Sequence, residues 1–266
     1  MIINSLKIIL MCLTLVQLNG FANTIILAEE EQESAKSISK KPKVIVQLNG
    51  AYYHHGFLPR LAEVLQPIGL KQNWYWPASR LYDLNDTSVE SHRIALLEKL
   101  AQLITSNTGD SALTDGLLKI KNQISQWQLA KRVLIPIDFD LAKINPSKNP
   151  KFSAGRYLLN LSKRTESIDL FGLLNAPVEM NHKGGSSINY YAEKINFLPS
   201  ANKSELYIIQ PDGKIIKAGY AYFNNTPIEL MPGSSIFVPF ISNLFSTEFD
   251  ELNQQIAELA INRISQ

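Results

Sequence analysis

The chain has 266 residues, of which 45% are hydrophobic and 19% are charged, with a formal net charge of +2. This length accommodates one large or two small domains, and this apolar content excludes a chain that is disordered throughout. The balance of 26 basic and 24 acidic residues gives no electrostatic bias toward nucleic acid or an anionic membrane.

The first 22 residues predict a cleavable secretory signal peptide. Lys7 precedes an apolar run from Ile8 to Leu18, and a small residue, Ala22, ends the segment. This run is well short of the ~20 apolar residues that span a bilayer, so we expect no transmembrane span in the mature chain. A cut after Ala28 is the alternative, because the apolar character continues up to it.

The location expected for the mature protein is the bacterial periplasm. The single cysteine, Cys12, lies within the predicted signal, so the mature chain would hold neither a disulfide nor a thiolate metal site. A disulfide-free exported chain is common in that compartment. Residues 23–43 are polar and predict a flexible tether.

A first β-rich domain is predicted over residues 44–86 and 132–166. Val44–Leu48 is expected to form a strand, and the apolar spacing in Phe57–Leu65 predicts a helix. Trp74–Leu81 predicts a strand or an extended edge, because Pro77 excludes a central strand. Further strands are expected at Val133–Leu141 and Arg156–Leu161.

A helical hairpin is predicted to interrupt this domain at residues 87–131. Thr87 and Glu90 form a capping-box pattern before a helix expected over Ser88–Thr105. Asp110 or Ser111 then begins a second helix that ends near Lys131. The short connection between the helices implies that they are antiparallel.

A second domain is predicted over residues 167–245. Its strongest local signal is Pro211-Asp212-Gly213, a turn that pairs Leu206–Gln210 with Lys214–Tyr220 as a hairpin. The other elements expected are a hairpin of Ile168–Leu174 with Val178–Met180, a helix over Ser187–Ile195, and a closing strand at Ile236–Val238. Four or five strands with one helix is the β-grasp arrangement.

The chain ends in a predicted amphipathic helix within residues 246–266. Phe249, Leu252, Ile256 and Leu259 lie on one face of a helix expected over Thr247–Ile264. This apolar stripe would dock either on the helix's own domain or on a partner. The fold class predicted is therefore α+β, with two β-grasp domains, a helical hairpin inserted in the first, and a C-terminal amphipathic helix.

A set of short segments extends along nearly the whole mature chain. The segments are Asn73–Leu81, Leu170–Leu174 with Pro177, Tyr207–Gly213, Tyr220–Asn224, Pro232–Val238, and Leu252–Ala257 with Arg263. Each segment is weak alone, but together and in this order they resemble the GfcC family of capsule and exopolysaccharide assembly proteins. The resemblance does not extend to Ala51–Gly56.

This resemblance implies a periplasmic protein, not an enzyme, that takes part in assembling or exporting capsular polysaccharide or exopolysaccharide. Its two β-grasp domains would be similar to those lining polysaccharide-export channels of the outer membrane. The partners implied are polysaccharide, outer-membrane export proteins, or both. No cofactor is expected.

Arg132 is the first candidate for binding a partner. It follows the second helix at a position where family members also carry a basic residue, and a guanidinium there would engage an acidic sugar or a phosphate. The alternative is a cation that satisfies the carboxyl end of the helix dipole. Arg80, within the segment Asn73–Leu81, is a second basic candidate.

Trp74 and Trp76 are the aromatic candidates. Their flat apolar faces suit sugar rings, but placement in a core or a domain interface is the favoured alternative. His54 and His55 have no further ligand nearby in the sequence, so they predict a solvated loop instead of a metal site.

Asp138 and Asp140 leave an enzymatic alternative open. On one face of a predicted strand, they would lie about 6.5 to 7 Å apart at their Cα atoms. A carboxylate pair is what glycoside hydrolysis requires, so the second hypothesis is a periplasmic polysaccharide-modifying hydrolase. A plain strand end explains the same residues, and no further acid-base pattern supports the hydrolase.

Overall fold

The structure is a computed structural model that describes residues 43–224, 226–242 and 247–264. Residues from Lys43 onward form one compact unit. The predicted signal peptide and almost all of the predicted tether lie outside the described residues. The bounds predicted for the two domains stay a prediction.

The first sheet has five strands in the order β2-β1-β5-β3-β4. The neighbouring strands β1 and β5 run parallel, and every other neighbouring pair is antiparallel. The strands are β1 (Val44–Leu48), β2 (Ala51–His55), β3 (Arg80–Asp83), β4 (Lys131–Val133) and β5 (Gly155–Asn160).

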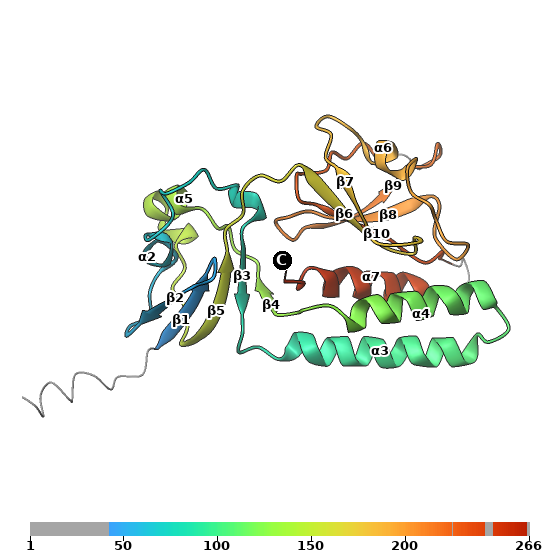
Figure 1. The fold of residues 1–266 in the computed structure, drawn as a ribbon, viewed down its shortest axis with the longest axis horizontal. Coiled ribbons are helices and arrows are strands. Elements are labelled where there is room, and N and C mark those ends of the chain that lie inside the picture. Colours follow the sequence, from blue (N-terminus) through green and yellow to red (C-terminus); the bar gives the residue numbers. More distant parts are fainter. Residues whose placement is uncertain (1–42, 225, 243–246, 265–266) are drawn as a thin grey trace, which may run out of the picture. The chain divides into compact units, whose positions relative to one another are not determined.

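The second sheet repeats this arrangement in the order β7-β6-β10-β8-β9, again with its first and last strands parallel at the centre (Figure 1). A short helix follows the second strand in each sheet. The second sheet's strands are β6 (Ser167–Gly172), β7 (Val178–Asn181), β8 (Glu205–Ile209), β9 (Ile215–Gly219) and β10 (Ser235–Val238), and the short helices are α2 (Leu61–Leu65) and α6 (Ile188–Ala192). The prediction of an α+β fold with two β-grasp domains is confirmed.

The two domains differ in how their third and fourth strands are joined. In the second, the backbone N–H of Gly213 donates to the Gln210 carbonyl at 2.9 Å, and Gly213 has φ of +94°, which closes the predicted turn between β8 and β9. In the first, the same position holds the helical hairpin α3 (Ser88–Ser106) and α4 (Ser111–Ser125). The predicted insertion is therefore present in the chain order.

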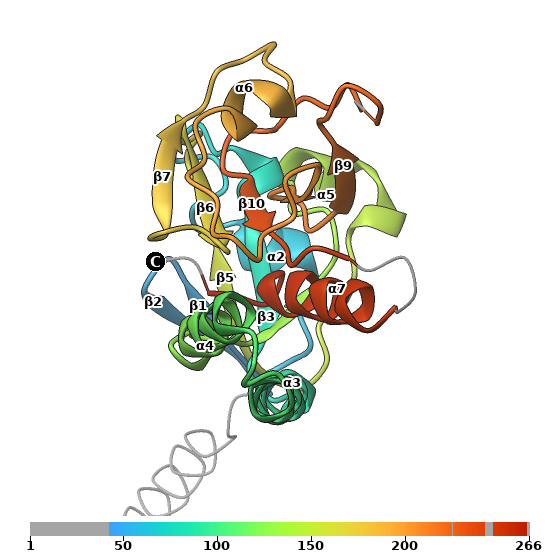
Figure 2. The same cartoon turned by 90° about the vertical axis from the view of Figure 1, so that its right-hand side faces the viewer.

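The hairpin interrupts the first domain in sequence but packs on the second. Leu96, Leu100, Leu117 and Ile120 are buried in one apolar cluster with residues of β6, β8 and β10. The last helix, α7 (Glu248–Ala260), belongs to the same cluster, and Figure 2 shows α3, α4 and α7 on one side of the second sheet. A separate apolar cluster fills the first domain.

The C-terminal helix docks on its own chain, which was one of the two predicted alternatives. Leu252, Ile256 and Leu259 are fully buried. The side-chain amide of Asn253 accepts from the Phe240 N–H and donates to the Phe240 carbonyl, both at 2.9 Å. The apolar stripe of the helix is thus used within the described chain and does not face a partner.

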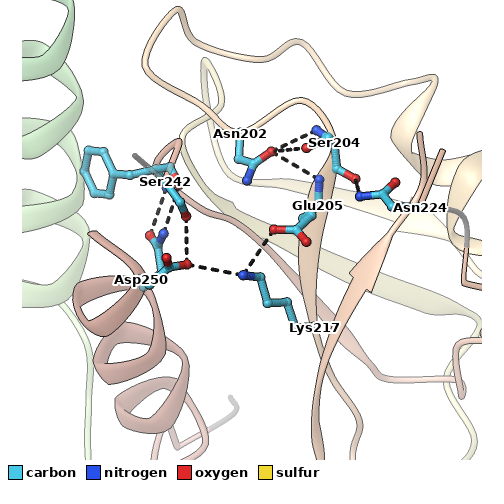
Figure 3. A network of polar contacts seen from close by, with 9 residues as sticks. Asn202, Ser204, Glu205, Lys217, Asn224, Ser242 and Asp250 are labelled. Carbon is cyan, nitrogen blue, oxygen red and sulfur yellow. Dashed lines mark hydrogen bonds and ion pairs between the residues drawn. The ribbon is translucent and has the colours of Figure 1, made fainter. Parts of the chain in front are cut away.

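A polar network ties the start of α7 to the second sheet (Figure 3). Lys217 on β9 pairs with Glu205 on β8 at 3.1 Å and with Asp250 on α7 at 3.2 Å. The Ser242 hydroxyl donates to the same Asp250 oxygen at 2.8 Å.

Four local predictions were wrong or too long, and the first is the second hairpin helix, which ends at Ser125 and not near Lys131. Val133–Leu141 is not one strand, because β4 ends at Val133 and a helix, α5 (Phe139–Ile144), begins soon afterward. His54 and His55 lie in β2, paired with β1, instead of in a loop. The helix expected from Phe57 begins only at Leu61, since Pro59 disfavours helical backbone before it and Glu63 accepts from the Arg60 N–H at the true start.

The segment Trp74–Leu81, predicted as a strand or an extended edge, contains a short 3-10 helix followed by the start of a strand. Trp76–Ala78 forms the 3-10 helix η1, with Pro77 inside it, and β3 follows directly. A second 3-10 helix, η2 (Pro146–Lys148), follows α5.

Candidate functional site

A polar cavity of about 540 Å³ lies where the first sheet, the hairpin, the second sheet and the chain end after α7 meet. A neighbouring cavity of similar volume shares Arg80, Asp169 and Glu179 with it. We call the two cavities together the arginine groove. The side chains that give it its character are Arg80, Trp127, Arg132, Asp169, Glu179 and Arg263.

Arg132 lies on β4 and is only 7% exposed. Its guanidinium donates a hydrogen bond to the Pro211 carbonyl in the β8–β9 turn, and its backbone N–H donates to the Asn262 side chain at 2.9 Å. Within the described residues, no carboxylate forms an ion pair with it. The helix-dipole alternative is wrong, because α4 already ends at Ser125.

The electrostatics of Arg132 reflect this burial. Loss of hydration lowers the pKa of Arg132 to about 10, and repulsion from Arg80 adds to the effect, whereas Tyr82 and Asp212 oppose it. The guanidinium therefore remains protonated at neutral pH. It is a buried cation whose nearest groups compensate its charge incompletely.

Arg80 and Arg132 come together because of strand register. Arg80 lies two residues before Tyr82 on β3, and Tyr82 pairs with Arg132 on β4, so all three share one face of the sheet. Leu81 and Val133, on the opposite face, pack in the core of the first domain. The structure thus gathers the two predicted basic residues at one site, and their role in binding stays a prediction.

Arg263 is a third groove arginine that the local sequence patterns did not single out. Its guanidinium lies 5.1 Å from the ring centres of both Trp127 and Phe171. Its carbonyl accepts from the Tyr82 hydroxyl at 2.7 Å, and its backbone pairs with Leu129. The one available signal was its place among the residues that resemble the GfcC family.

Asp169 and Glu179 form an acidic wall opposite these cations. They face each other across the antiparallel pair β6–β7, where like charges are unfavourable. Their side chains reach solvent in the groove, yet surrounding protein removes part of the hydration of Asp169 and raises its pKa. Arg263 and Arg80 oppose that rise, and Glu179 adds to it.

The predicted tryptophans lie outside the arginine groove. Trp74 packs against the core of the first domain, and its indole N–H donates to the Ile68 carbonyl at 3.0 Å. Trp76 packs against the same core and also lines a separate cavity. For Trp74 the structure agrees with the core alternative.

Asp138 and Asp140 are not side by side on a strand, so that part of the hydrolase hypothesis is wrong. Asp138 caps α5, where its carboxylate accepts from the Leu141 N–H at 2.9 Å, and Asp140 lies in the first turn of the helix. The strand was predicted because the alternating apolar residues around Pro136 resemble one. A six-residue helix with an Asp cap gives too short a periodic signal to be distinguished from a strand.

In the part of the chain that the structure describes, no group of three or more His, Cys, Asp and Glu residues is arranged to hold a metal ion. Among the described helices, none is long and apolar enough to cross a membrane.

The fold and this groove define a class of protein with two β-grasp domains, a helical hairpin packed on the second domain, and a groove of mixed charge lined by both domains. Family models agree with this class. Residues 44–164 match "Capsule biosynthesis GfcC, N-terminal", and residues 176–265 match "Capsule biosynthesis GfcC C-terminal". The chain belongs to the GfcC family, which confirms the resemblance found in its sequence.

A curated relative supports the same assignment. The protein named "Uncharacterized protein YjbG" from Escherichia coli (strain K12) is 29% identical over 195 residues. The match covers 73% of this chain and 78% of the relative.

Proposed function

We propose that the protein is a non-enzymatic periplasmic factor in the assembly or export of capsular polysaccharide or exopolysaccharide. It would act by binding the polysaccharide, or proteins of the export machinery, in the arginine groove. The family's description supplies the link to capsule biosynthesis. The signal peptide predicted over residues 1–22 supports the periplasm.

The observation that carries this proposal is the incomplete compensation of Arg132. Its guanidinium has five N–H donors, and the described residues use one of them, at the Pro211 carbonyl. A buried charge without a paired anion costs free energy, and an acidic group of a ligand would supply the missing partner. Uronic acid carboxylates, phosphate substituents and acidic protein side chains all have this chemistry.

The enzymatic alternative has less support. Asp138 is occupied as a helix cap, and the Asp169–Glu179 pair faces three arginines. Such surroundings suit the recognition of charge better than the protonation of a glycosidic oxygen, which needs one carboxyl held neutral in an apolar site.

The test replaces Arg132 in cells that make the protein. In an Arg132→Met strain we expect surface polysaccharide to fall toward the level of a deletion strain, because the anion site is lost. Arg156→Met is the matched control, since Arg156 is exposed on β5 and lies outside the groove. Normal polysaccharide in the Arg132→Met strain would contradict the proposal.

A second measurement separates binding from hydrolysis. Purified mature protein is incubated with the native polysaccharide, and the chain length is then measured. The binding role predicts unchanged length. Shortening that Asp138→Asn abolishes would establish the hydrolase instead.

A further inference from the structure

A second cavity, distinct in character from the arginine groove, lies beside Trp76. Its volume is about 550 Å³, and we call it the Trp76 pocket. It touches the groove only through Arg132, which lines both. The residues that set its chemistry are Trp76, Leu134, Ile137, Asp138, Asp212 and Met231.

The walls of the Trp76 pocket come from both domains. The first domain supplies η1 and the segment between β4 and α5, and the second supplies Asp212 from the β8–β9 turn. That turn packs tightly here, because a Cβ atom on Gly213 would come within 2.6 Å of Leu134. The positive φ of Gly213 favours glycine at this position, and the turn places Asp212 at the edge of the pocket.

Two carboxylates in this largely apolar pocket retain acceptor capacity. One oxygen of Asp138 accepts from the Leu141 N–H, and one oxygen of Asp212 accepts from the Lys214 N–H at 3.0 Å. The second oxygen of each accepts no hydrogen bond from any described residue. The buried Ser79 hydroxyl, on a residue that also lines the pocket, likewise has no hydrogen-bond partner among the described residues.

Apolar walls combined with two carboxylates that have free acceptor oxygens limit which kind of ligand can fill the Trp76 pocket. An aliphatic side chain would cover the apolar wall but leave two carboxylates unsatisfied. A sugar ring in the pyranose form has an apolar C–H face for the Trp76 indole and several hydroxyl donors for the carboxylates. Pockets for small ligands commonly have this composition, with apolar walls and a few convergent polar groups.

We infer that the Trp76 pocket is a sugar-binding subsite that holds one pyranose unit of the polysaccharide. The unit packs on Trp76 and donates hydroxyl hydrogen bonds to Asp138 and Asp212. This inference rests on the proposed function and makes it more specific, because it names polysaccharide over an export protein as the ligand. Arg132, which lines both cavities, would then meet an acidic group on a neighbouring sugar.

The test uses short oligosaccharides prepared by partial acid hydrolysis of the surface polysaccharide of the cells that make the protein. Saturation-transfer NMR with the full mature protein should show magnetisation transfer to C–H protons of one sugar unit. The oligosaccharide should also shift one indole N–H resonance. Trp76→Phe assigns that resonance by removing it.

Two matched variants locate the binding. Leu134 is 60% exposed at the pocket, and in Leu134→Arg the new guanidinium can pair with the free carboxylate oxygens and occupy the site. Ile144, the last residue of α5, is 80% exposed but does not line the pocket. We expect Leu134→Arg to weaken oligosaccharide binding about tenfold or more, and Ile144→Arg to leave it unchanged.

Two other results would overturn the inferred sugar subsite, and each has a different consequence for the proposed function. Binding that Leu134→Arg and Ile144→Arg affect equally would place the sugar elsewhere and leave the proposed function intact. Absence of any saturation transfer to the native protein would exclude a sugar subsite. If Arg132→Met still lowered surface polysaccharide in that case, the function would stand, with an export protein as the ligand.

Discussion

At the scale of single residues, Arg132 combines burial, positive charge and few partners. Its contact with the Pro211 carbonyl links the first sheet to the β8–β9 turn, so a purely structural role is the competing explanation. The two roles predict different stabilities, because removing an unpaired buried charge also removes its desolvation penalty, whereas removing a structural clamp gives no such compensation.

Arg132→Met should therefore destabilise the protein by less than about 2 kcal/mol, because the loss of a partner for the buried Pro211 carbonyl, which costs about 1 to 3 kcal/mol, is partly offset by removal of an unpaired buried charge. Urea denaturation measures this, with Arg156→Met as the control. A loss of about 3 kcal/mol or more would identify Arg132 as a structural clamp instead of a binding residue.

Asp250 makes a pH-dependent contribution at the same scale. The Ser242 hydroxyl lowers the pKa of Asp250 below its usual value, and Lys217 lowers it further. A carboxyl whose pKa is lower in the folded state stabilises above the unfolded value, and this contribution disappears as the pH falls through the folded value.

Asp250→Asn should lower the free energy of unfolding at neutral pH by about 0.5 kcal/mol, a small effect because the pair is partly exposed and screened by solvent. The difference from the native protein should shrink as the pH falls below about 3.9, the usual carboxyl pKa, and should vanish once the pH lies below the lowered pKa of Asp250 in the folded state. Chemical denaturation at a series of pH values checks this. A difference that persists in acid would mean that Asp250 stabilises the protein through packing and not through its charge.

At the scale of elements, the end of the second sheet and α7 depend on one side chain. Asn253 is 1% exposed and satisfies both backbone groups of Phe240. Without it, a buried donor and a buried acceptor lose their partners, and each such loss costs about 1 to 3 kcal/mol.

Asn253→Ala should thus destabilise the protein by about 3 kcal/mol, measured by thermal or urea unfolding. Gln254→Ala, on the exposed side of the same helix, should change the free energy by less than about 0.5 kcal/mol. Equal effects of the two changes would show that the amide of Asn253 is not what anchors α7.

Elements with strong local signals could be predicted from the sequence, and short ones could not. The Pro211-Asp212-Gly213 turn has specific turn residues and the two hairpin helices have sustained periodicity, so the turn and the starts of both helices were predicted closely. The second helix nevertheless ends at Ser125 and not near Lys131. The strand β2 and the helix α5 are set by pairing with β1 and by a single Asp cap. These features give little periodic signal over so few residues.

At the scale of the whole molecule, the helical hairpin is inserted in the first domain in sequence but packs against the second domain. Local patterns predicted where α3 and α4 interrupt the chain, but their apolar faces could match either domain. The structure places them in the core of the second domain. Likewise, Arg80 and Arg132 were identified singly, whereas Asp169, Glu179 and Arg263 join them only through tertiary contacts.

Because the hairpin packs on the second domain, a destabilising substitution in the hairpin should affect the second domain more than the first. Leu100 on α3 is fully buried, and Leu100→Ala should cost about 2 to 5 kcal/mol. Hydrogen exchange should then accelerate in β6 and β8 more than in β1 and β5, although the hairpin is inserted in the first domain. Leu159→Ala, in the core of the first domain, should show the opposite pattern.

The most direct test of the central claim is photocrosslinking in intact cells. A photoreactive residue at Glu179, exposed in the arginine groove, should capture polysaccharide or an export protein. The same residue at Gln254, exposed on α7 and outside the groove, should capture neither. Capture at Gln254 with none at Glu179 would contradict binding in the groove.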